Sequence, residues 1–302
     1  MCSGIEAASV AWKDLGWEAI GFSEIEPFPS AVLAHHFPEV PNHGDMQGFR
    51  DWPIKRGTVD LLVGGTPCQS FSIAGLRGGL ADARGSLALT YLQLADHYRP
   101  RWIVWENVPG VLSSNGGRDF GSFLGGLAHI GYQFSWRVLD AQYFGVPQRR
   151  RRVFVVGHCG DWRSAAEVLF ERESVHRDLA AGSEKGKDAA GGIQECSGAR
   201  EWPKRIAPTL NAAFGKKLGL EDQHALGGAG LFIPDPQRLS VRRLTLRECE
   251  RLQGFPDDWT AVPYRGKTAP DGPRYKAIGN SMAVPVMKWI GERIAKVERE
   301  RV

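Results

Sequence analysis

The sequence predicts a protein of the α/β class with a mainly parallel sheet. Short apolar runs bounded by turn residues recur along the first half of the chain, as in strands that are buried on both faces. Amphipathic stretches separate these runs, and the alternation of strands with helices is typical of parallel sheets. A chain of 302 residues can form one large domain together with a smaller one.

The individual elements follow from the periodicity in chain order. Predicted strands cover residues 17–22, 59–63, 102–105 and 153–156. Predicted helices cover residues 31–37, 87–98, 120–130, 245–252 and 284–297. The helix over 245–252 should begin with a capping box, because Thr245 and Glu248 have the spacing that this motif requires.

The middle of the chain has a different character. From about residue 160 to 235 the periodicity weakens, and Gly, Ala and polar residues dominate. We therefore predict a smaller, irregular domain over residues 158–239. The larger domain would combine residues 1–157 with residues 240–302.

The net charge of +4 is unevenly distributed. Residues 240–302 carry 13 basic and 8 acidic side chains, whereas residues 1–157 carry 14 of each. Four arginines, Arg149 to Arg152, are consecutive. Such a run is usually a solvated surface, and a contact to phosphate or substrate is the alternative. In an extended strand, Arg150 and Arg152 would lie on one face.

The cysteines predict neither a disulfide framework nor a zinc site. Their number is odd, their spacings are wide and the sequence contains no C-x-x-C pair; they are Cys2, Cys68, Cys159, Cys196 and Cys249. We therefore expect reduced thiols in a cytoplasm and no bound metal. No apolar run approaches the length of a membrane span, and the first residues lack the pattern of a signal peptide.

The segment G-G-T-P-C-Q-S-F-S places Cys68 directly after a predicted buried strand. Ligands of open α/β sheets bind at the carboxyl ends of strands, and the two glycines would allow close approach of the backbone. A cysteine in this setting is either a small buried apolar side chain or a reactive thiol. Because a free thiol is mostly protonated at neutral pH, a nearby cation such as the arginine cluster would favour the reactive form.

Glu106 follows the predicted strand W-I-V-W and precedes Asn107 and Val108. It therefore occupies the same kind of position as Cys68, at the carboxyl end of a strand. A carboxylate there can hydrogen-bond a nitrogen-bearing ligand, and an acid that caps a loop or a helix is the alternative.

A small-residue turn, Ser3-Gly4-Ile5, stands before a predicted helix whose N-terminus could receive a carboxylate or a phosphate. Glu24 ends the next predicted strand, which is the usual place for an acid that binds ribose hydroxyls. Asp45 ends a further turn. Together these positions indicate a nucleoside cofactor.

The ordered motifs resemble those of the DNA cytosine-5 methyltransferases, especially the phage and bacterial members. The resemblance spans nearly the whole chain apart from residues 158–239. The motifs that carry it are C-S-G-I-E-A-A, S-E-I-E, G-D-M, G-G-T-P-C-Q-S-F-S, R-G-S-L, E-N-V, Q-R-R-R-R, R-L-T-L-R-E-C-E-R-L-Q-G-F-P and Y-K-A-I-G-N-S-M-A-V-P. The resemblance implies a Rossmann-like S-adenosylmethionine-dependent methyltransferase sheet with a smaller target-recognition domain.

The resemblance also implies the catalytic roles. In this family the cysteine of the Pro-Cys-Gln motif attacks C6 of cytosine, and Cys68 matches it. Glu106 matches the glutamate that contacts N3 and the exocyclic amine. Arg150 and Arg152 match the arginines that face the active site. The target cytosine would be flipped out of double-stranded DNA.

For the cofactor, S-adenosylmethionine, the resemblance assigns positions in three parts of the chain. Ser3, Gly4 and Ile5 would surround its amino-acid part, and Glu24 would bind the ribose. Ile25 stands where many relatives have an aromatic residue against adenine, so that contact would be weaker. The remaining matched positions are Asp45 and Met46, at the adenine, and Asn280 and Ser281, in a segment that returns to the cofactor.

The sequence departs from the family at its start. Relatives carry an apolar strand before the Ser-Gly turn, whereas only Met1 and Cys2 stand there, so we expect a truncated first strand. Three hypotheses therefore stay open: a DNA cytosine-5 methyltransferase, a tRNA-directed enzyme with the same motifs, and a cofactor-deficient DNA-binding relic. For the first we expect a cytoplasmic monomer in a bacterial cell, encoded by the bacterium or a phage, in a restriction-modification setting.

Overall fold

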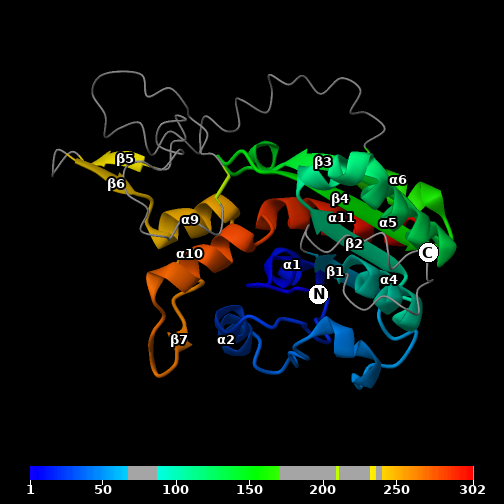
Figure 1. Ribbon diagram of the computed structural model, residues 1–302, viewed down its shortest axis with the longest axis horizontal. Coiled ribbons are helices and arrows are strands. Elements are labelled where there is room, and N and C mark those ends of the chain that lie inside the picture. Colours follow the sequence, from blue (N-terminus) through cyan, green and yellow to red (C-terminus); the bar gives the residue numbers. More distant parts are fainter. Residues whose placement is uncertain (67–86, 171–208, 211–231, 236–239, 302) are drawn as a thin grey trace.

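The computed structural model describes residues 1–66, 87–170, 209–210, 232–235 and 240–301. Within these ranges the main sheet has four strands in the order β1-β2-β4-β3 (Figure 1). They are β1 (Leu61–Gly65), β2 (Trp102–Asn107), β3 (Tyr132–Asp140) and β4 (Arg151–Cys159). Two short ribbons are separate from it: β5 (Phe232–Asp235) with β6 (Ser240–Arg243), and β7 (Pro263–Tyr264) with β8 (Lys267–Thr268).

Helices cover both faces of the sheet, and alternate residues of β2 therefore pack into two different cores. Ile103 and Trp105 pack with α4 (Leu87–Tyr98) and α5 (Arg118–His129). Trp102 and Val104 belong to the core that includes the remaining helices (Figure 1). That core contains residues of α1 (Ala7–Trp12), α2 (Pro27–His36), α6 (Trp162–Leu169), α9 (Leu246–Gln253), α10 (Asp271–Asn280) and α11 (Val284–Arg299).

The predicted α/β class is confirmed, but the prediction of a mainly parallel sheet is wrong. Among the described strands of this sheet, β1 and β2 pair in parallel, whereas β4 is antiparallel to both β2 and β3. The sequence prediction missed β3. The connection from β3 to β4 contains no crossover helix, and strands that are joined by such a direct return pair antiparallel.

The predicted strand over residues 17–22 is also wrong. Phe22 alone forms a β-bridge, to Asn42. Residues 17–22 line a cavity of about 890 Å³ that they share with the β1 residues Leu61 and Val63. A strand is stable only beside a hydrogen-bonded neighbour, and apart from the bridge at Phe22 these residues have no paired strand among the described residues.

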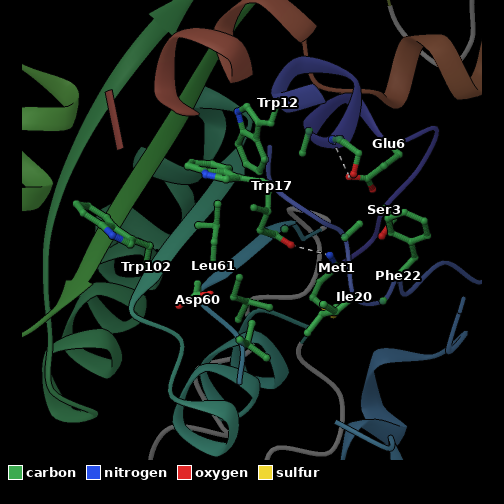
Figure 2. A pocket seen from close by; sticks show the side chains of 18 of the residues that line it. Met1, Ser3, Glu6, Trp12, Trp17, Ile20, Phe22, Asp60, Leu61 and Trp102 are labelled. Atoms are coloured by element: carbon green, nitrogen blue, oxygen red, sulfur yellow. Dashed lines mark hydrogen bonds between the residues drawn. The ribbon is translucent and has the colours of Figure 1, made fainter. Parts of the chain in front are cut away.

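The first residues of the chain lie against the same edge of β1. Residues 1–6 contain no strand. The amino group of Met1 donates a hydrogen bond of 2.6 Å to the carbonyl oxygen of Val63. Figure 2 shows the indoles of Trp12, Trp17 and Trp102 on one side of this cavity. The edge of β1 therefore borders an open, largely apolar space.

The other predictions agree with the structure to within a few residues. The capping box of Thr245 and Glu248 is confirmed at the start of α9, whereas α6 and α10 were not predicted.

The range 158–239 that the sequence predicts for a smaller domain begins inside β4, and α6 packs on β3, β4 and α11. Residues 158–170 therefore lie with the larger domain. No helix of the described ranges has the length and apolar character needed to cross a bilayer.

Helix α1, which carries the turn of Ser3 and Gly4 at its start, packs closely on α11. The indole of Trp12 donates a hydrogen bond of 2.6 Å to the carbonyl oxygen of Met287. A Cβ atom on Gly291 would overlap this indole. We predict that Gly291→Ala lowers the free energy of unfolding by about 1–3 kcal/mol, the usual cost of overpacking a core.

Gly125→Ala is the matched control, because Gly125 lies inside α5 and an added Cβ would have nothing within 4 Å. This control should gain about 0.4–1 kcal/mol through the unfolded state. Urea denaturation of both variants measures the difference. Equal stabilities would contradict the proposed contact between α1 and α11.

Candidate active site

The candidate site lies where β1 and β2 end side by side. The two strands pair in parallel with Gly65 opposite Glu106. A Cβ atom on Gly65 would come within 3.1 Å of Glu106 Oε2 and within 3.1 Å of the terminal methyl of Met282. Gly65 therefore permits a close approach of the two strand ends and leaves room for the carboxyl group.

Glu106 forms an ion pair with Arg152, which lies near the start of β4. Arg152 Nε is 3.0 Å from Glu106 Oε1, and the two side chains are 15% and 13% exposed. Burial raises the pKa of Glu106, while the cations of Arg152 and Arg150 oppose the shift. The net direction is upward, so Glu106 keeps its proton to a higher pH than an exposed glutamate.

The loop that leaves β1 is held at its first residue by β2. Trp105 Nε1 donates to Thr66 Oγ1 at 3.0 Å, and Asn107 Nδ2 donates to the Thr66 carbonyl oxygen at 2.9 Å. Thr66 and Asn107 are both buried. The predicted nucleophile, Cys68, lies outside the described residues, two positions after this anchored threonine.

Arg150, the other arginine that the resemblance assigns to the active site, makes its hydrogen bonds to backbone. It is 2% exposed, and its guanidinium donates to the carbonyl oxygens of Leu210, Gly279 and Ser281. It is nevertheless close enough to Glu106 to influence that pKa, so Arg150 and Arg152 do share one side of the chain. Their partners differ: Arg152 holds the carboxyl group, whereas Arg150 holds backbone.

The predicted cofactor turn forms as expected. Gly4 has φ of 58° and donates its N–H to Glu24 Oε2 at 2.8 Å. Ser3 Oγ accepts a hydrogen bond of 3.2 Å from the N–H of Ser23. Ile5 is fully buried, so its side chain belongs to the core under the turn. Ser3, Gly4 and Glu24 are thus brought together from two segments that are about 20 residues apart in sequence.

The next three predicted residues have different environments. Ile25 is 69% exposed and Met46 is buried. The Sγ atom of Cys2 is 3.8 Å from the Sδ atom of Met46, which places Met46 beside the start of the chain. Asp45 accepts a hydrogen bond from the N–H of Gln47 at the start of a short 3₁₀ helix. Asp45 and Met46 therefore lie near the turn, whereas Ile25 offers only an exposed aliphatic side chain.

One end of the cavity brings several predicted cofactor residues together. Its walls include Ser3, Gly4, Glu106, Asn280 and Ser281. Asn280 ends α10, and Ser281 follows it directly. The volume is within the range of about 300–1,000 Å³ that is usual for ligand pockets. Polar backbone, a carboxylate and apolar walls suit a nucleoside with an amino-acid tail, so the described residues fit S-adenosylmethionine.

Three residues of the site had no predicted role. Glu6 is buried, has φ of 62° and caps α1 by accepting a hydrogen bond from the N–H of Ser9 (Figure 2). Thr66 and Asn107 connect the two strand ends. Thr66 and Asn107 belong to the motifs that contain Cys68 and Glu106. Their position in the sequence beside a predicted reactive residue could therefore have identified them.

Comparisons with known proteins identify the family of the chain. The sequence model of the family described as C-5 cytosine-specific DNA methylase matches residues 1–185 and 234–296. The protein described as DNA N-6-adenine-methyltransferase of Escherichia phage P1 is 36% identical over 460 residues, which cover 98% of this chain and 60% of that protein. The type II methyltransferase M2.BsuMI of Bacillus subtilis is 31% identical over 303 residues, which cover 97% of this chain and 74% of that protein.

The fold has solved counterparts as well. The crystal structure of the S. pombe Dnmt2 methyltransferase superposes with a TM-score of 0.64 at 17% identity, covering 99% of this chain and 97% of that one. The chain therefore shares the fold of that structure. The chain belongs to the C-5 cytosine-specific DNA methylase family. It spans less than two thirds of the phage P1 relative.

The ion pair of Glu106 with Arg152 should make stability depend on pH. Arg152→Met removes a cation that lowers the pKa of Glu106, so that pKa rises further. Between the unfolded and the folded pKa the native state then binds more protons than the unfolded state, and stability falls as pH rises. We predict that this variant loses about 1–3 kcal/mol more at about pH 8 than at about pH 5.5.

Urea denaturation at the two pH values measures this difference. Arg152→Lys is the control, because it keeps the cation beside Glu106 and should show a smaller pH dependence. If Arg152→Met were destabilised equally at both pH values, Glu106 would not be the titrating partner.

Proposed function

We propose that this chain transfers a methyl group from S-adenosylmethionine to C5 of cytosine in double-stranded DNA. The observation that carries the proposal is the buried Glu106, held by Arg152 at the edge where the Thr66 loop begins. A protonated carboxyl group there can donate to N3 of a cytosine that is flipped out of the duplex. The membership in the cytosine-C5 family supports the same reaction.

In the proposed reaction the Cys68 thiolate attacks C6 of cytosine, and Glu106 stabilises the resulting charge by donating to N3. The cofactor supplies the methyl group that C5 accepts. A base then removes the proton from C5, and the thiolate leaves from C6 with the electrons of the C–S bond. Covalent attack makes C5 nucleophilic, which is the purpose of the cysteine.

The cavity residues Ser3, Gly4, Asn280 and Ser281, together with Glu24 beside the Gly4 turn, would hold the cofactor, and no metal is needed. The described positions of Ile25 and Asp45 are compatible with contacts at the adenine. We further propose that the region between residues 171 and 239 recognises the DNA sequence. The two stretches that the family model matches leave residues 186–233 between them, which supports a region of variable sequence there.

A second candidate is methylation of adenine at N6, because the phage P1 relative is named for that reaction. Sequencing DNA from cells that express the chain, with a method that reads 5-methylcytosine and N6-methyladenine separately, decides between them. We expect 5-methylcytosine at one short sequence. Exclusive N6-methyladenine, or methylated tRNA with unmodified DNA, would overturn the proposal. Calorimetric titration with S-adenosylmethionine tests the relic hypothesis, which predicts no binding.

The proposed nucleophile can be tested directly. We predict that Cys68→Ser lowers methyl transfer by at least about 10⁴-fold, the scale of losing a catalytic nucleophile. It should also lose the covalent complex with a duplex that contains 5-fluorocytosine, as followed by denaturing electrophoresis. Cys159→Ser is the control, because Cys159 ends β4 away from the candidate site and should be dispensable. Covalent trapping by Cys68→Ser would show that another group is the nucleophile.

A further inference from the structure

Arg150 is a buried cation whose hydrogen bonds go to backbone. Its Nη1 donates to the carbonyl oxygen of Leu210 at 3.0 Å. Its Nη2 donates to the carbonyl oxygens of Gly279 at 3.2 Å and Ser281 at 2.6 Å. One planar group therefore connects two segments that are about 70 residues apart in sequence.

Keeping a charge at this place has a cost. Burial, together with the cation of Arg152, lowers the pKa of Arg150 to about 9, while Glu106 opposes the shift. Arg150 is thus still charged at neutral pH. The hydrogen bonds of Nη1 and Nη2 offset part of the cost of burying the charge, although Nε has no partner among the described residues. An apolar side chain could fill the same space without this cost. The forked donors of the guanidinium are therefore needed to bind the carbonyl oxygens of two separate segments at once.

The first segment that Arg150 holds belongs to the cavity. Gly279 lies in the last turn of α10, and Asn280 and Ser281 line the cavity beside Ser3 and Gly4. Gln253 supports the same segment, since its Nε2 donates to the carbonyl oxygen of Ile278 at 2.8 Å. A ligand that contacts Asn280 and Ser281 therefore acts on a backbone that Arg150 fixes.

The second segment is the pair Thr209 and Leu210. Leu210 is buried in the core of the larger domain. Thr209 Oγ1 donates to the carbonyl oxygen of Arg149 at 2.6 Å. The two residues are thus docked onto the start of β4, and they belong to the range for which DNA recognition is proposed.

We propose that Arg150 is a positioning residue that couples ligand binding in the cavity to the docking of Thr209 and Leu210. The coupling rests on the proposed function, because the cavity ligand is taken to be the methyl donor or its product. A ligand that orders residues 279–281 strengthens the hold of Arg150 on Leu210. By linkage, a docked Leu210 raises the affinity of the cavity for that ligand.

Hydrogen exchange followed by mass spectrometry tests this coupling. The probe is S-adenosylhomocysteine, which binds without turnover. In the wild-type protein, saturating probe should slow the exchange of the peptide that contains Thr209 and Leu210 by about fivefold or more, the lower range of typical couplings. In Arg150→Lys and Arg150→Met the slowing should disappear, although calorimetry still detects binding of the probe with weaker affinity.

Arg151→Lys is the matched control, because Arg151 is the exposed residue that directly follows Arg150. It should keep the wild-type slowing. Thr209→Val removes the bond to Arg149 without touching the cavity, and it should reduce the slowing at least by half. This variant carries the test if the Arg150 variants do not fold, as judged from thermal unfolding.

Three outcomes would overturn the coupling. If the probe binds the wild-type protein and leaves the exchange of this peptide unchanged, the coupling is absent and the proposed function is unaffected. The peptide could exchange faster in the Arg150 variants while the probe still slows its exchange by the same factor as in the wild-type protein. In that case Arg150 has only a structural role. Failure of the probe to bind the wild-type protein would overturn the proposed function and the coupling together.

Discussion

The parallel pairing of β1 with β2 places Glu106 beside the point where the chain leaves β1. Its register sets Gly65 opposite Glu106, so the loop that follows β1 leaves the sheet beside the carboxyl group. The hydrogen bonds from Trp105 and Asn107 to Thr66 then fix the first residue of that loop. A shift by one residue would exchange the faces of the strand and turn Glu106 into the core that Trp105 now fills.

The electrostatics of the site depend on this geometry. Glu106 lies close to two arginines and still has a raised pKa, because burial outweighs both cations. The two arginines are distinguished by their partners. Arg152 forms an ion pair with Glu106 and sets its orientation. Arg150 donates to the carbonyl oxygens of Leu210 and Ser281, and thereby connects the surroundings of Glu106 to two segments that are distant in sequence.

The sequence predicts those features that depend on short stretches of chain. Apolar runs located β1, β2 and β4, and cap spacing located the start of α9. Alternation correctly put Arg150 and Arg152 on one side, but it could not reveal that carbonyl groups from residues 210, 279 and 281 converge on one of them. The strand predicted over 17–22 failed for a related reason, since pairing depends on a neighbour that the segment itself does not encode.

The turn at Gly4 is held by hydrogen bonds from other parts of the chain. Glu24 holds the N–H of Gly4, and Trp259 donates to the carbonyl oxygen of Ile5 at 3.0 Å. Trp12 anchors the following helix on Met287. Two of these three bonds come from residues more than 250 positions away. The turn and the helix that follows it are therefore held mainly by the C-terminal part of the chain, which also contributes Asn280 and Ser281 to the lining of the cavity.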